Sequence, residues 1–293
     1  MTTRVELLHQ THYHYERPVL LSAQWVRLKP AVHCLSTIES YQLTIEPTNH
    51  LRHWQQDPFG NLVARIDFLE VVESVTIQVQ LIAKLEPVNP FDFLVDACAD
   101  NFPFMYEPQI RKALTSYLEV TEHGPRLTQW VRQINQQPRR STIDFLVGLT
   151  QQIYQMISYQ SRLQAGVQPA EVTLQRASGS CRDSAWLLVQ LIRSLGLATR
   201  FVSGYLVQLA PDTPGDTPSD GLGRDTFDLH AWAEVYVPGA GWIGLDATSG
   251  LLTTQGHIPL ASAPAPAGAA PIEGTTESVK TWLTYSSTLI RLP

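Results

Sequence analysis

Apolar and polar residues alternate along several short stretches of the chain up to residue 90. Residues 41–45 and 74–81 place apolar side chains at every second position, which is the period of a β-strand with one buried face. Proline, asparagine and glycine separate these stretches and favour turns between them. The pattern predicts an antiparallel β-sandwich that occupies residues 1–100.

Beyond Pro108 the apolar positions take the three- and four-residue spacing of amphipathic helices. This spacing is found in residues 110–118, 127–134 and 143–156. A further run, residues 186–195, is almost wholly apolar and predicts a buried helix, after which strand patterns return over residues 199–246. We therefore expect an α+β protein, in which residues 101–293 form a helical region and a core with one helix packed on an antiparallel sheet.

Two stretches have a composition that regular structure does not favour. Residues 261–271 are dominated by alanine and proline, and we expect an extended strap on the surface of the second unit. Residues 209–229 are rich in proline, glycine and aspartate, so we expect a long loop that ends beside His230. A solvated loop is the simpler interpretation, and a lid that selects cations is the alternative.

A cysteine lies where loop sequence gives way to the buried helix. Gly179 and Ser180 favour a turn and an N-cap, so Cys181 is expected in the first helical turn. Unpaired backbone N–H groups and the positive end of the helix dipole stabilise a thiolate there. A cysteine taken alone is more often a small buried hydrophobic residue. We expect Asp183 to complement the helix N-terminus, and Arg182 either to pair with it or to raise the local positive potential.

Two strand patterns follow the cysteine helix and are joined by a turn. The first opens on His230, the second ends on Asp246, and Pro-Gly-Ala-Gly lies between them. If the turn centres on Pro238, His230 faces Asp246 across an antiparallel ladder. The carboxylate, at an exposed strand end, would orient the imidazole, whose other nitrogen could accept the proton of Cys181. The sequence therefore predicts a nucleophile, a general base and an orienting carboxylate.

Four motifs in this order resemble the transglutaminase-like superfamily of papain-related cysteine enzymes. They are GSCRDSA at residues 179–185, RFVSGY at 200–205, LHAWAEV at 229–235 and GWIGLD at 241–246. The resemblance implies a papain-like core and a catalytic triad, with Cys181 as nucleophile, His230 as general base and acid, and Asp246 as the orienting residue.

Motifs upstream and downstream bear on the same resemblance. YHYERPV at residues 13–19, RLKP at 27–30 and DPFGN at 57–61 resemble the β-rich N-terminal domain found before this core in bacterial members. After His257, an alanine- and proline-rich stretch stands where many bacterial members have a charged, aromatic segment. This departure resembles a subgroup that is often joined to further domains, so partner domains or proteins outside this chain are expected.

Weaker candidates surround the predicted triad. Trp232 and Trp242 could line an acyl pocket, although a core role fits them equally well. The backbone N–H of Cys181 is a natural oxyanion donor, because it lies at a helix start. Tyr159 and Gln160 are candidates for a second donor, on their chemistry and their position in the resemblance.

Composition narrows the classes of partner and cofactor. The chain has 293 residues, 44% of them hydrophobic, which suffices for two compact units, and its net charge of −6 argues against nucleic acid as a partner. No apolar run reaches the ~20 residues of a membrane helix, and the polar N-terminus does not resemble a signal peptide, so we expect a cytoplasmic protein without membrane contact. Cys34, Cys98 and Cys181 are widely spaced, and we expect neither a disulfide, a metal nor any other cofactor.

The predicted chemistry is cleavage of an amide in a peptide or protein substrate through an acyl-enzyme. A protein-glutamine acyltransferase stays open, because hydrolysis and amine transfer differ only in the second nucleophile. A catalytically silent peptide-binding module is a further alternative, which loss of a triad residue would have favoured. The loop before His230 has few aromatic residues and suits a wetted cleft, so we expect hydrolysis to dominate over amine transfer.

Overall fold

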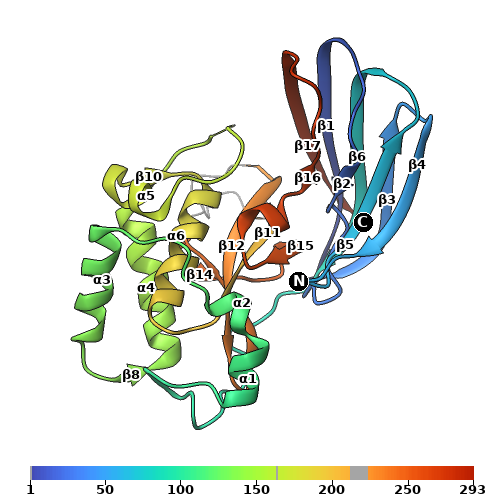
Figure 1. The fold of residues 1–293 in the computed structure, drawn as a ribbon. Coiled ribbons are helices and arrows are strands. Elements are labelled where there is room, and N and C mark those ends of the chain that lie inside the picture. Colours follow the sequence, from blue (N-terminus) through green and yellow to red (C-terminus); the bar gives the residue numbers. More distant parts are fainter. Residues whose placement is uncertain (1, 163, 212–223) are drawn as a thin grey trace.

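The computed structural model describes residues 2–162, 164–211 and 224–293, which form a β-sandwich and a mixed α/β unit (Figure 1). In these residues the strands are β1 (Thr3–Val19), β2 (Gln24–Val26), β3 (Thr37–Glu46), β4 (His50–Gln56), β5 (Leu62–Phe68), β6 (Val72–Leu85), β7 (Asn101–Phe102), β8 (Arg140–Ser141), β9 (Ser158–Tyr159), β10 (Ser178–Gly179), β11 (Thr199–Gln208), β12 (Thr226–Val237), β13 (Gly241–Asp246), β14 (Leu251–Leu252), β15 (His257–Ala263), β16 (Ile272–Glu273) and β17 (Thr281–Leu292). The helices are α1 (Pro108–Ala113), α2 (Thr115–Leu118), α3 (Pro125–Asn135), α4 (Thr142–Met156), α5 (Ala170–Arg176), α6 (Cys181–Ser194) and the 3₁₀ helix η1 (Pro266–Ala269).

The predicted N-terminal sandwich is confirmed. One sheet has the strand order β17-β1-β6-β3 and the other β16-β2-β5-β4, and apolar residues of both sheets share one core. The predicted alternation lies in β3 and β6, which pair antiparallel, with Leu43 opposite Val79 and both side chains buried. Two-residue periodicity therefore placed these strands correctly.

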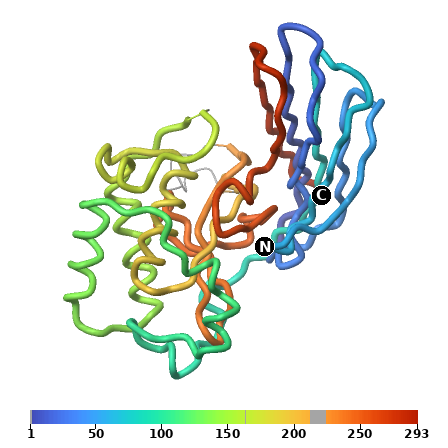
Figure 2. Tube along the Cα trace, in the orientation of Figure 1, coloured from blue at the N-terminus to red at the C-terminus, as the bar shows by residue number. Residues whose placement is uncertain are grey.

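The C-terminal part of the chain returns to the sandwich, as the trace in Figure 2 shows. β16 pairs with β2 and β17 pairs with β1, so both sheets are completed by residues that we had assigned to the second unit. The expected surface strap is also wrong, because residues 261–263 are buried in β15 and η1 follows. Small alanine and serine side chains let this segment pair closely with β11.

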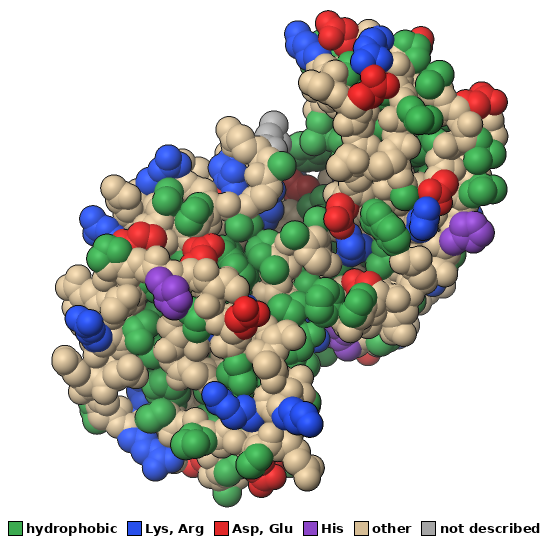
Figure 3. Space-filling model, in the orientation of Figure 1, with side chains coloured by type: hydrophobic (Ala, Val, Ile, Leu, Met, Phe, Trp, Pro, Cys, Tyr) green, Lys and Arg blue, Asp and Glu red, His purple; other side chains and the backbone are tan. Residues whose placement is uncertain are grey.

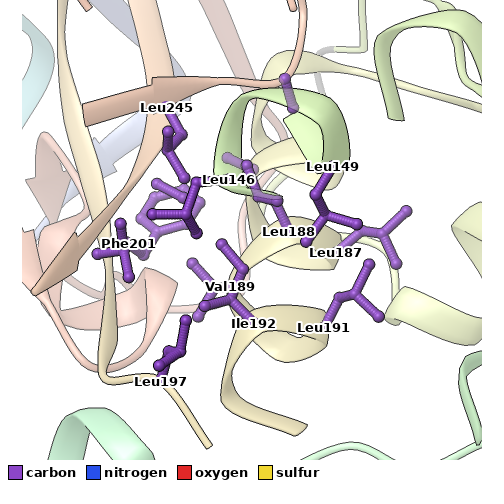
Figure 4. Close-up of a cluster of buried hydrophobic side chains, with 14 of the residues drawn as sticks. Leu146, Leu149, Leu187, Leu188, Val189, Leu191, Ile192, Leu197, Phe201 and Leu245 are labelled. Carbon is purple, nitrogen blue, oxygen red and sulfur yellow. The ribbon is translucent and has the colours of Figure 1, made fainter. Parts of the chain in front are cut away.

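The mixed unit confirms the α+β class. Its five-stranded antiparallel sheet has the order β14-β13-β12-β11-β15, and α6 packs on β11 and β12. Figure 4 shows leucine and isoleucine side chains of α6 meeting Leu146 and Leu149 of α4 and Leu245 of β13. The predicted helices 127–134 and 143–156 are α3 and α4, whereas 110–118 is divided into α1 and α2 at Leu114.

The two units share an interface rather than a flexible connection. Tyr205, Val207 and Phe227 of the mixed unit's sheet belong to the core cluster of the sandwich. His9 of β1 places Nδ1 2.9 Å from the Tyr205 hydroxyl, and both side chains are buried. The five-stranded sheet of the mixed unit therefore packs against α6 and also against the core of the sandwich. Over the described residues, no helix has the length and apolar character needed to cross a membrane.

Candidate active site

Cys181 is the first residue of α6, and Ser180 is its N-cap. The N–H and the hydroxyl of Ser180 each donate to Oδ2 of Asp183, at 2.9 Å, which closes a capping box. Gly179 is required by this close approach, since a Cβ there would lie 2.8 Å from the Cβ of Asp183. The local sequence thus starts the helix at the cysteine, as predicted, and the thiol lies at the positive end of the dipole.

Asp183 is the anchor of the segment that precedes the helix. Its fully buried carboxylate accepts hydrogen bonds from the Arg162 guanidinium and from the backbone N–H of Gln168. Burial opposes the charged form, but these bonds and those from Ser180 outweigh it and lower the pKa of Asp183 to about 2. The partner of Asp183 is therefore Arg162. Arg182 instead donates to the carbonyl of Arg162, at 2.7 Å, so of the two alternatives for Arg182 the pairing with Asp183 is not found.

The hairpin of β12 and β13 has a register two residues away from the predicted one. Ala233 lies opposite Leu245, and the turn centres on Gly239, whose φ of 86° suits glycine. One step further along this register, Asp246 faces Trp232 rather than His230. His230 and Asp246 are nevertheless diagonal neighbours, because every second side chain of a strand points to the same face of the sheet. Their contact is therefore kept.

His230 joins the thiol to the carboxylate. Its Nε2 is 3.1 Å from Oδ2 of Asp246 and 3.3 Å from the Thr248 hydroxyl, and the Cys181 thiol is a further hydrogen-bond partner of the ring. Burial opposes protonation of the ring, but the hydrogen bonds and charges of Asp246 and Cys181 prevail and raise the pKa of His230 to about 10. The arrangement therefore favours the protonated form of the His230 ring, the imidazolium, near neutral pH. The structure begins β12 at Thr226, so His230 lies within the strand and not at its start.

Asp246 is buried, contrary to the expectation of an exposed strand end. Only 1% of its surface is exposed, and Oδ1 accepts bonds from the N–H and the hydroxyl of Thr248, both at 2.8 Å. Burial raises the cost of the charge, yet hydrogen bonds from His230 and His257 hold the pKa of Asp246 well below its ordinary value. The carboxylate therefore stays ionised and fixes the imidazole of His230.

Comparisons with known proteins agree with this fold and motif order. Residues 5–84 match the bacterial transglutaminase-like N-terminal region, and residues 128–247 match the transglutaminase-like superfamily. The chain belongs to the transglutaminase-like superfamily.

Similar proteins span nearly the whole chain. An uncharacterized protein of Mycobacterium tuberculosis is 28% identical over 267 residues, 88% of this chain and 82% of that protein. An uncharacterized protein of Mycobacterium leprae is 25% identical over 274 residues, 87% of this chain and 86% of that protein. The fold resembles the crystal structure of a candidate cysteine protease from Cytophaga hutchinsonii, with a TM-score of 0.68 and 17% identity over 100% of this chain and 92% of that one.

His257 is a further residue of the site in this transglutaminase-like protein, and none of the predicted motifs includes it. The structure puts its Nε2 3.2 Å from the same Oδ2 of Asp246 that His230 contacts. The backbone N–H of Thr254 donates to Nδ1 of His257, so the ring proton is on Nε2 and His257 donates to Asp246. The only sequence signal was a lone histidine ahead of the alanine- and proline-rich stretch, and it is a weak one.

The side chains of His230, Asp246 and His257 lie close enough together to be candidates for a metal site. Ligand atoms of His230, Asp246 and His257 lie within 4.8 Å of one another. A metal needs unprotonated ring nitrogens, whereas the bond from Thr254 keeps the proton on Nε2 of His257. The donor set therefore fits a hydrogen-bonded group centred on a carboxylate and does not fit a metal centre.

The two tryptophans predicted at the cleft have different positions. Trp232 is buried, with its ring 6.4 Å from that of His230 and 5.3 Å from that of His257, so it supports the histidines from within the core. Trp242 lies at the other end of the hairpin, opposite Tyr236, with the Arg200 guanidinium 4.3 Å above its ring. Trp242 is therefore not part of the site.

The two predicted oxyanion donors lie on the segment beside β10. Tyr159 pairs with Gly179 and its side chain is 60% exposed. Partial desolvation of its hydroxyl, followed by the charge of Cys181, raises its pKa. The backbone N–H of Gln160 donates to the carbonyl of Gly179, which leaves the amide side chain for any other role. Their role in oxyanion binding stays a prediction. Residues 212–223 of the predicted loop lie outside the described residues.

Proposed function

We propose that this transglutaminase-like protein is a cysteine-dependent hydrolase that cleaves amide bonds of peptides or proteins. The observation that supports this most directly is the continuous hydrogen-bonded series Cys181, His230 and Asp246 at the start of a buried helix. The same residue types in this relation carry out covalent acyl transfer in cysteine hydrolases.

The proposed reaction has two half-reactions. The Cys181 thiolate attacks the amide carbonyl to form a carbon–sulfur bond, while the His230 imidazolium gives its proton to the leaving nitrogen as the carbon–nitrogen bond breaks. The N–H of Cys181, unpaired at the helix start, stabilises the oxyanion. Water then loses a proton to His230 and attacks the thioester, which releases the acid and restores the thiolate and the imidazolium.

The surroundings of the nucleophile support water as the second nucleophile. A pocket of about 350 Å³ is bounded by Thr248, whose hydroxyl is 3.3 Å from Nε2 of His230, and by Ser184, three residues after Cys181 in α6. Its other lining residues are Tyr154, Gln155, Ile157, Ser158, Tyr159 and Ala247. Four of the eight lining side chains, Gln155, Ser158, Ser184 and Thr248, carry an aliphatic hydroxyl or an amide, so the pocket admits ordered water. An enzyme that transfers acyl groups to amines must instead keep water from the thioester.

Partitioning of the acyl-enzyme tests the proposal. We would incubate the protein with a peptide library and excess glycine ethyl ester, then analyse the products and Cys181 by mass spectrometry. We expect an acyl adduct on Cys181 and products that mostly end in a carboxylic acid, with no turnover by Cys181→Ala. A majority of amine adducts would reassign the protein as an acyltransferase, and intact peptides with an unmodified Cys181 would contradict an enzymatic function.

A further inference from the structure

The C-terminal strand β17 is the edge of its sheet, and no described strand pairs with its other side. Its first half is exposed on both faces, with Trp282, Leu283 and Tyr285 each between 42% and 49% accessible. A long edge strand with exposed apolar side chains is a template for another extended chain. Such a feature calls for an occupant.

The hydrogen-bond pattern identifies the residues whose backbone is unpaired. The N–H of Glu16 donates to the carbonyl of Lys280, its direct partner in the register of β1 and β17. In an antiparallel ladder, opposite residues that exchange two hydrogen bonds alternate with opposite residues that exchange none. Glu16 and Lys280 are a bonded pair, so the even-numbered residues of β17 bond to β1. The N–H and C=O groups of Leu283, Tyr285 and Ser287 therefore point to the free edge.

The odd-numbered side chains of β17 lie on the face that meets the mixed unit. On β1 the same face carries His9, opposite Ser287, and His9 contacts Tyr205 of β11. β17 lies next to β12, the strand that carries His230, and Arg291 of β17 forms an ion pair of 2.6 Å with Asp225 just before β12. The end of β17 is thus fastened to the start of β12, five residues before His230.

The exposed half of β17 rises from this anchor along one side of a hollow. Figure 1 shows β17 as the strand of its sheet nearest the mixed unit, and Figure 3 shows the surface hollowed between the two units. The Tyr285 side chain is close enough to Tyr159 for its charge to help raise the pKa of the Tyr159 hydroxyl, after burial and the larger effects of Cys181 and Asp228. The free edge therefore borders the hollow between the two units, near Tyr159, which pairs with Gly179 two residues before Cys181.

We propose that an extended segment of the polypeptide substrate pairs with the free edge of β17 and is held there while its amide reaches Cys181. The backbone groups of Leu283, Tyr285 and Ser287 supply the hydrogen bonds, and the exposed Leu283 and Tyr285 side chains pack against alternate substrate side chains. The substrate class is accordingly unfolded or extended polypeptide, recognised mainly by its backbone. This inference rests on the proposed function.

A matched pair of variants separates backbone from side-chain recognition. Tyr285→Pro removes an outward N–H that does not bond to β1, whereas Tyr285→Ala removes the side chain and keeps the N–H. With unfolded β-casein as the probe, we expect Tyr285→Pro to lower kcat/KM by about fivefold or more relative to Tyr285→Ala, since one hydrogen bond is lost. Acylation of Cys181 by p-nitrophenyl acetate, which is too small to reach β17, should not change in either variant.

A second measurement leaves the residues of β17 unaltered. In Cys181→Ala, β-casein should slow amide hydrogen exchange at Leu283, Tyr285 and Ser287. Equal kcat/KM for both variants, or unchanged exchange in β17, would overturn the inference, because backbone recognition does not depend on the substrate sequence. A dimer that Tyr285→Pro abolishes would assign the edge to a second copy instead. Failure of p-nitrophenyl acetate to acylate Cys181 would count against the proposed function itself.

Discussion

One carboxylate holds the site together at the scale of single residues. Asp246 accepts four hydrogen bonds, two from Thr248 and one each from His230 and His257. Because both histidines share Oδ2, neither ring can rotate without losing its bond to the same atom. The orientation of His230 thus depends on the whole group.

Asp246→Asn should lower the rate of acylation of Cys181 strongly. The amide cannot stabilise the imidazolium of His230, and the comparable change in a serine triad lowers kcat by about 10⁴. Because Asp246 is buried, the free energy of unfolding should also fall, by about 1 to 3 kcal/mol, as bonded donors lose their acceptor. Burst kinetics with p-nitrophenyl acetate and urea unfolding measure the two effects, with the exposed Asp144→Asn as a control. Nearly full activity would reduce the triad to a dyad.

His257 is predicted to be a positioning residue that acts through Asp246. His257→Leu should lower kcat by about tenfold or more, a typical effect of losing the partner that orients a site ligand. His257→Gln can still donate from a side-chain nitrogen and should restore part of the rate. The alkaline limb of the pH profile of kcat/KM, where the His230 imidazolium loses its proton, separates this role from general loss of stability, because a loss of stability alone does not alter the titration of His230. An unchanged profile in His257→Leu would assign His257 to packing alone.

The three thiols should differ in reactivity. Burial raises the pKa of Cys34 to about 11, Cys98 is exposed, and Cys181 lies beside His230 at a helix start. With iodoacetamide near pH 7 and peptide mapping, we expect Cys181 to be modified first and Cys34 last. His230→Gln should slow the modification of Cys181 and leave Cys98 unaffected. Equal rates at Cys181 and Cys98 in the unaltered protein would contradict an activated nucleophile.

At the scale of elements, the start of α6 is stabilised from both directions along the chain. Asp183 accepts hydrogen bonds from Ser180, the N-cap residue of α6, and from Arg162, which lies in the segment before the helix. That segment also carries Tyr159 in β9, which pairs with the residue two positions before Cys181. A single buried carboxylate therefore sets both the helix start and the wall of the site.

Asp183→Ala should destabilise the protein by about 3 kcal/mol, because the Arg162 guanidinium and the cap donors lose a buried acceptor. The pKa of Asp183 is lowered to about 2, so its contribution to the free energy of unfolding is present above pH 3.8 and is lost as the pH falls toward 2. Urea unfolding at pH 7 and pH 2.5 should show a difference between the two proteins that shrinks at the lower pH. A constant difference would indicate that the charge of Asp183 is unimportant.

At the scale of the whole molecule, the sandwich contributes to the site through a shared interface. His9 contacts Tyr205 across the units, and burial lowers the pKa of His9 to about 4. The folded protein therefore requires a neutral ring at a pH where the unfolded chain already binds a proton.

Stability should consequently fall as the pH drops from 6.5 toward 4, the window between the unfolded and folded pKa values of His9. The loss reaches about 3 kcal/mol at the lower end of this window, at about 1.4 kcal/mol per pH unit. Urea unfolding at pH 7 and pH 4.5 measures it, and His9→Gln should show a smaller difference between the two pH values. If both proteins respond equally, His9 is protonated within the fold and the interface tolerates its charge.

The sequence by itself predicted the features that depend on neighbours along the chain. Strand and helix periodicities, the N-cap before Cys181 and the hairpin that brings His230 near Asp246 are all encoded within a few residues or across one turn. Two-residue periodicity also protected the site from an error in register, because a shift of two positions leaves both side chains on the same face.

The tertiary structure alone decided what joins distant segments. The pairing of β17 with β1, the choice of Arg162 as partner of Asp183 and the second bond to Asp246 from His257 have no periodic signal. Burial of Asp246 is of the same kind, since it depends on which elements cover the strand end. Such contacts arise when packed layers bring side chains within hydrogen-bond distance, and local pattern carries no information on which layers meet.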